Sequence, residues 1–152
     1  MGLRATLSIL ALWGLLAIGC ATPLTEADLE AKLQDAGATV SRPGRKRVIP
    51  IYAESKTIAW TLLAEAKVDP ESQLSAQLGK SLALARRRGL STIVGGPYPA
   101  LSDQVVRNAF GLCRDGDLFG LTVVFVSPER PSQALAQAAA RAKVRLHYRA
   151  LP

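Results

Sequence analysis

The chain is poor in the side chains that most enzymes use for catalysis and metal binding. Its 152 residues include one histidine and two cysteines. A single histidine excludes metal sites built from several histidines, and a Ser-His-Asp triad would depend on His147 alone. His147 stands between Arg145 and Arg149, where we expect an exposed surface side chain. The motifs GxSxG and HExxH are also missing, so the sequence favours a protein that is not an enzyme.

A hydrophobic run long enough to cross a bilayer is missing too. The apolar run at residues 5–18 is 14 residues long, which falls short of the roughly 20 that a membrane-spanning helix needs. The basic residue Arg4 precedes the run, and small residues follow it up to Cys20. This order of a basic start, a short apolar stretch and small residues is that of a secretory signal peptide.

The end of this export segment, Ala17-Ile18-Gly19-Cys20, resembles the lipobox of bacterial lipoproteins. The resemblance implies that residues 1–19 are removed and that Cys20 is lipidated and becomes the first residue. Ala21 lacks the acidic side chain that retains such proteins in the inner membrane, which implies the periplasmic face of the outer membrane. Several acyl chains on one residue would anchor the protein stably in the lipid. The alternative is an ordinary signal peptide cut near Ala21, which would release a free periplasmic domain.

Disulfide bonds are excluded if Cys20 is acylated, because Cys113 is then the only thiol. The fold must depend on its hydrophobic core. Cys113 follows Val106 and Phe110 at helical spacing, and a free cysteine commonly packs as a small apolar residue. We therefore expect Cys113 to be buried.

Acidic residues are outnumbered, since 19 Lys and Arg stand against 12 Asp and Glu, a formal charge of +7. Such a balance suits nucleic acid, an anionic surface or an acidic partner, and nucleic acid is not expected for a periplasmic lipoprotein. One basic cluster, residues 86–88, falls at the end of an expected helix, where cations are favoured. The other is Arg45, Lys46 and Arg47, which are candidate partner-binding residues or simply a solvated surface.

Periodicity predicts a short helix, a linker and then alternating strands and helices. The helix covers residues 26–36, with Thr25 and Asp28 as a capping box, and must dock on the domain or on a partner because it is too short to be stable alone. Residues 37–46 are predicted as a basic linker. Residues 57–61 fit either a helix or the second strand of a hairpin. The expected elements are strands at 48–52, 90–94, 121–126 and 144–151, and helices at 56–67, 69–88, 101–113 and 132–143.

This alternation is typical of a small layered α/β domain with a mostly parallel four-stranded sheet. The predicted organisation is a signal peptide at 1–19, an acylated N-terminus with helix and linker at 20–46, and the α/β domain at 47–152. Pro50 predicts an edge or bulged strand, and residues 123–126 predict an inner strand. In the last strand Arg145 and Arg149 lie on a solvated face, where they either guard an open strand edge or select a partner that docks there.

A ligand pocket, if present, is expected at the carboxyl ends of the strands, where loops and helix starts converge. Glu54 and Glu129 would form an acid–base pair only if their loops meet. Gly95 and Gly96 either let a ligand approach the backbone or serve the turn alone. The candidate ligand-binding residues in these loops are Ser55, Lys56, Tyr98, Glu129 and Arg130.

Two functions remain open from the sequence. The first is a non-catalytic, outer-membrane-anchored periplasmic lipoprotein that binds a protein partner, as a component of an envelope-spanning machine for secretion, conjugation or pilus assembly. The second is a periplasmic α/β domain that binds a small ligand or acts as an enzyme. Neither requires a cofactor. Convergence of the candidate ligand-binding residues on one concave pocket would favour the second.

Overall fold

The computed structural model describes residues 23–40 and 45–152. The predicted signal peptide, Cys20 and the centre of the predicted linker lie outside these residues. No described helix has both the length and the apolar character required to cross a membrane. The elements are α1 (Glu26–Gly37), β1 (Lys46–Pro50), α2 (Lys56–Val68), α3 (Gln73–Arg87), β2 (Ser91–Gly95), α4 (Pro99–Leu112), β3 (Thr122–Ser127), α5 (Gln133–Arg141) and β4 (Arg145–Ala150).

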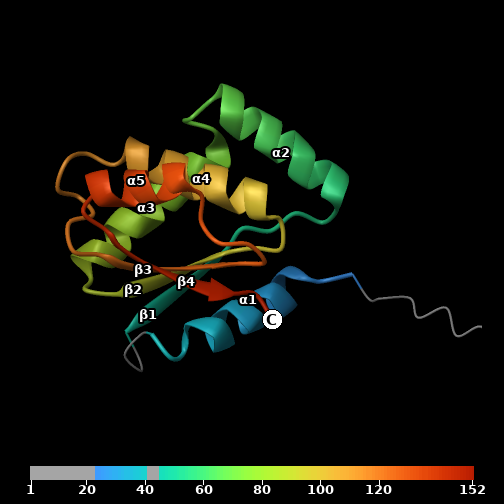
Figure 1. The fold of residues 1–152 in the computed structure, drawn as a ribbon, viewed down its shortest axis with the longest axis horizontal. Coiled ribbons are helices and arrows are strands. Elements are labelled where there is room, and N and C mark those ends of the chain that lie inside the picture. The colour runs from blue at the N-terminus through green and yellow to red at the C-terminus, as the bar shows by residue number, and fades with distance from the viewer. Residues whose placement is uncertain (1–22, 41–44) are drawn as a thin grey trace, which may run out of the picture.

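The four strands form one sheet in the order β1-β2-β3-β4, and every neighbouring pair is parallel. This confirms the predicted α/β fold and adds the strand order. Because consecutive parallel strands connect with a right-handed crossover, stepping steadily in one direction places all connecting helices on the same face. Figure 1 shows α2 to α5 on that face and α1 alone on the other.

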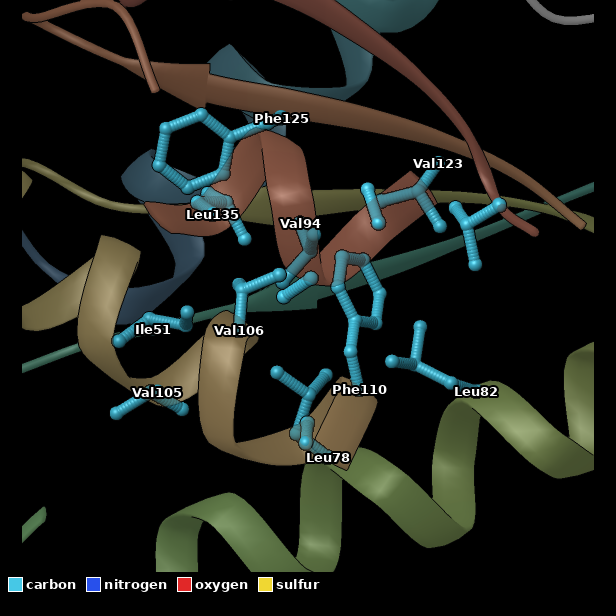
Figure 2. Close-up of a cluster of buried hydrophobic side chains, with 14 of the residues drawn as sticks. Ile51, Leu78, Leu82, Val94, Val105, Val106, Phe110, Val123, Phe125 and Leu135 are labelled. Carbon is cyan, nitrogen blue, oxygen red and sulfur yellow. The ribbon is translucent and has the colours of Figure 1, made fainter. Parts of the chain in front are cut away.

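The main core lies between the sheet and its connecting helices. Val94 of β2 and Phe125 of β3 meet Leu82, Phe110 and other apolar side chains of the helices in this cluster (Figure 2). Strand β3 is buried from Val123 to Ser127, as expected for an inner strand that is covered on both faces. The prediction of an inner strand at residues 123–126 is therefore confirmed.

Helix α1 closes the opposite face of the sheet with a second, smaller core. Thr25 and Asp28 form the predicted capping box, in which the Asp28 N–H donates to Thr25 Oγ1 at 3.1 Å and the Thr25 N–H to Asp28 Oδ2 at 3.2 Å. Leu29 and Leu33 are fully buried against Ile93 and two valines of β3. The sequence left open whether this helix docks on its own domain or on a partner. The structure shows it docked on the domain.

The outer strand β1 tolerates Pro50 because the backbone nitrogen of this residue is on the side of the strand that has no neighbouring strand. The Ile51 N–H donates to Gly95 O, and Arg45 O accepts from the Ser91 N–H. Odd-numbered residues of β1 therefore bond to β2, and the N–H that Pro50 lacks would point away from the sheet. This confirms an edge strand, since a proline is accepted where no ladder bond is lost.

The structure decides one open alternative of the sequence analysis and corrects the bounds of two elements. Residues 57–61 belong to helix α2 and not to a hairpin, with Ser55 Oγ accepting from the Ile58 N–H. Helix α3 begins at Gln73, later than predicted, because Asp69 ends α2 and forms a turn in which its side chain accepts from the Glu71 N–H. Strand β1 begins at Lys46, so the expected linker ends one residue earlier.

The glycine pair Gly95-Gly96, at the end of β2, is required by close backbone packing. A Cβ on Gly96 would lie 2.1 Å from Ile51 O, so we expect Gly96→Ala to destabilise the fold by about 1–3 kcal/mol through overpacking. Gly111 of α4 is the matched control, because a Cβ there meets no heavy atom within 4 Å. Gly111→Ala should instead stabilise the protein by about 0.5–1 kcal/mol. Urea unfolding of both variants checks this, and equal midpoints would contradict it.

Candidate functional site

A cavity of about 530 Å³ lies at the carboxyl edge of the sheet, between α2, α4 and the loops that follow β2 and β3. Its volume falls within the range of known ligand pockets. The strand order never reverses, so the fold has none of the crevices that open between diverging crossovers. The hollow forms instead because α2 packs chiefly on α4, at the outer side of the helical layer (Figure 1).

One face of α2 forms a complete wall of this cavity. The lining residues of this helix are Lys56, Ala59, Trp60, Leu63 and Lys67. They follow the pattern i, i+3, i+4, i+7, i+11 and so share one side of a helix. With a rise of 1.5 Å per residue, the eleven steps from Lys56 to Lys67 extend over roughly 16 Å. The opposing wall comes from α4 between Pro99 and Arg107. The cavity is thus an elongated channel, which we call the α2–α4 groove.

The two walls are fixed to each other by polar contacts below the groove. Asn108 Nδ2 donates to Ala66 O at 2.7 Å, linking α4 to the last turn of α2. Gln104 Nε2 donates in turn to Asn108 Oδ1 at 2.9 Å. Because Ala66 neighbours Lys67 and Asn108 neighbours Arg107, the cations Lys67 and Arg107 occupy the same end of the groove.

Apolar surface is concentrated on α2. Trp60 is 59% exposed although it is the largest side chain of the wall. Ile58 and Val68, on the same helix, are exposed as well, and among the described residues Phe119 is the one other large apolar side chain of this kind. Of these exposed side chains, Trp60 lines the groove, whereas Ile58, Val68 and Phe119 lie outside its lining.

The rim of the groove is predominantly positive. Lys56, Lys67, Arg107 and Arg130 line it, against the carboxylates Asp103 and Glu129. Asp103 is already engaged, because its two oxygens accept from the N–H and the hydroxyl of Ser132, each at 2.8 Å. Ser132 is the N-cap of α5, where the positive end of the helix favours a carboxylate. The groove therefore presents an excess of positive charge.

The structure brings together four of the five candidate ligand-binding residues, since Lys56, Tyr98, Glu129 and Arg130 all line the groove. Ser55 does not line it, and its hydroxyl caps α2 instead. Glu54 is also outside the lining, so the acid–base pair with Glu129 is not assembled. Gly95 and Gly96 are likewise outside it, and their role is the close packing of the strand ends.

Several residues that line the groove were not predicted. Trp60, Lys67 and Arg107 belong to the groove but were not among the candidates. The spacing of Lys56, Trp60, Leu63 and Lys67 is that of one helix face and could have been recognised in the sequence. The opposing wall on α4 could not be predicted from the sequence, because it depends on the tertiary contact between α4 and α2.

The candidate partner-binding residues lie elsewhere. Arg45, Lys46 and Arg47 stand at the start of β1, the opposite edge of a parallel sheet from the groove. Arg145 and Arg149 are exposed on β4, as the alternation predicted. Arg149 Nη1 donates to Tyr148 O at 3.1 Å. This bond occupies a carbonyl group of the outer strand, which favours a guarded edge over a docking edge.

Cys113 is half-buried at the end of α4, with its Sγ 3.6 Å from Gly79 O. Burial, and to a lesser degree the charge of Asp117, raises the pKa of this thiol. Because the thiolate is the reactive form, we expect iodoacetamide to modify native Cys113 more slowly near pH 8 than the same residue in urea-unfolded chain. Rate profiles that coincide from pH 7 to pH 10 would contradict this expectation.

The comparisons with known proteins provide no relative. No family model matches the sequence, and no curated protein or solved structure matches it either. Among the described residues no group of three or more His, Cys, Asp or Glu is placed to hold a metal ion. The function must therefore be argued from the groove itself.

Proposed function

We propose that this protein is an acyl-anchored, non-catalytic binding domain of the bacterial envelope that holds a protein partner at the periplasmic face of the outer membrane. The observation that carries the proposal is the α2–α4 groove, an elongated apolar hollow with Trp60 exposed at its wall. Tryptophan is among the residues most enriched at the energetic centres of protein interfaces. The lipobox-like sequence ending at Cys20 supports the location.

The lining of the groove supports binding rather than catalysis. Its titratable side chains are lysines, arginines, Tyr98 and two carboxylates. Both carboxylate oxygens of Asp103 accept hydrogen bonds from Ser132 at the start of α5, so this side chain has a structural role. Glu129 is exposed and stands without a second free carboxylate in the lining. An assembly component of a secretion, conjugation or pilus machine fits this chemistry.

A small-ligand-binding periplasmic domain is the second candidate. It is favoured by one specific observation, the convergence of Lys56, Tyr98, Glu129 and Arg130 on a single cavity. The elongated shape of the groove and its position on the outermost helix favour a partner protein over a compact ligand.

Cross-linking in living cells tests the proposal. The full-length chain would be produced in its native host, treated with a lysine-reactive reagent and purified from the outer membrane. We expect discrete products that contain a second envelope protein, absent when an unrelated acylated periplasmic protein is treated in the same way. A chain recovered only as an uncross-linked monomer would count against a protein-binding role.

A further inference from the structure

The geometry points to a specific occupant of the α2–α4 groove: we infer that it binds an amphipathic segment of the partner protein, apolar along one side and acidic at both ends. This inference rests on the proposed function and specifies the partner for it. Three properties of the groove carry it, namely its length, its apolar wall and the position of its charges.

The length of the groove suits a peptide segment. The α2 wall extends over roughly 16 Å between Lys56 and Lys67, which corresponds to about five residues of extended chain or about three turns of helix. Such a hollow also suits helix-in-groove recognition, in which an amphipathic helix inserts its apolar face into a hydrophobic groove.

The centre of the groove is apolar, with Ala59, Trp60 and Leu63 on α2 and Leu101 on α4. Leu63 and Leu101 are buried in the floor, whereas Trp60 is more than half exposed. A tryptophan that projects from a fixed floor can cover an aliphatic or aromatic side chain of a ligand and release water from both surfaces. The occupant must therefore carry apolar side chains at its middle.

Cations stand at both ends of this apolar centre. Lys56 begins α2 at the carboxyl edge of the sheet, where the loop with Arg130 also lies. Lys67 and Arg107 occupy the other end, beside the contact between Asn108 and Ala66. In the described part of the chain none of these four cations forms an ion pair. Carboxylates at each end of the bound segment would complement them and set its position along the groove.

Photo-cross-linking from within the groove tests this inference. The full chain would carry p-benzoylphenylalanine in place of Trp60, or, as the matched control, in place of Phe119, which is also aromatic and 54% exposed but lies outside the groove. After irradiation in cells, mass spectrometry identifies the attached peptide. We expect a product from position 60 alone, attached to a segment with acidic residues on both sides of an apolar stretch.

The identified segment would then be synthesised and titrated, with tryptophan fluorescence as the readout, against the mature chain that begins at Cys20, in which Trp60 is the only tryptophan. We expect Lys56→Glu combined with Lys67→Glu to weaken binding at least tenfold. The control, Arg87→Glu combined with Arg88→Glu, makes the same change in net charge on exposed residues of the α3 end and should leave the affinity within twofold. Equal losses in both variants would overturn the charge assignment.

Two further outcomes separate this inference from the proposed function. Lysine-reactive products with a partner, but none from position 60, would overturn the groove as the binding place and leave the protein-binding role standing. Attachment from position 60 to a lipid, a glycan or a basic peptide would overturn the acidic segment as the occupant. The absence of partner products from every position would overturn both.

Discussion

Leu33→Ala is expected to destabilise the protein by about 2–5 kcal/mol, the usual cost of deleting a buried leucine side chain. Leu33 is fully buried and belongs to the small cluster that joins α1 to β2 and β3. A helix of 12 residues is marginal by itself in water, so α1 should remain ordered only while this cluster holds it. Loss of the side chain would release the helix and expose Ile93 and Val124.

Urea unfolding monitored by circular dichroism measures this effect, and hydrogen exchange of α1 amides shows where it arises. Glu30→Ala, an exposed position on the same helix, is the control and should shift stability by less than about 0.5 kcal/mol. If Leu33→Ala behaved like Glu30→Ala, the described contact between α1 and the sheet would not contribute to the stability of the domain.

Cys20→Ser is expected to move the protein from the membrane fraction to the soluble fraction. Acyl chains on a single residue supply about 0.8 kcal/mol for each buried methylene, and serine offers no thiol to carry them. Fractionation of cells and intact mass measurement of the N-terminus check this expectation. Cys113→Ser is the control, because Cys113 lies at the end of α4 and far along the chain from the export segment.

A wild-type N-terminus without added mass would contradict the lipobox interpretation, since Cys20 must carry its modification in every mature molecule. Processing that continues in the presence of an inhibitor of lipoprotein signal peptidase would contradict it as well. The domain fold would be unaffected by either result, but the outer-membrane location would lose its basis.

Local chemistry made much of the fold predictable. The capping pair of Thr25 and Asp28, the cap at Ser55 and Gly89 beyond the end of α3 each depend on residues a few positions apart. Gly89 adopts a φ of 66°, a conformation that glycine permits at a helix end. The predicted start of α3 at residue 69 was wrong. Asp69 followed by Pro70 is equally compatible with the first residues of a helix and with a turn, and only the surrounding chain decides between them.

The strand order and the groove could not be predicted for a different reason. Both depend on which elements meet, and the apolar pattern of β2 is equally compatible with several neighbours. The loops that carry Lys56, Tyr98 and Arg130 were recognisable, because parallel strands bring their carboxyl ends to one edge. The role of Trp60 could not be recognised, since the exposure of this side chain depends on how far α4 covers α2.

Helices α1 and α2 lie on opposite faces of the sheet (Figure 1), which bears on how a tethered molecule would be oriented. Lys32 Nζ donates to Pro152 O at 2.9 Å, so the C-terminus is held beside α1. Glu26 is six positions after Cys20, and a chain segment of that length spans at most about 20 Å. In a molecule acylated at Cys20, the face of the sheet that carries α1 and Pro152 would therefore lie nearer the lipid than the face that carries α2 and Trp60.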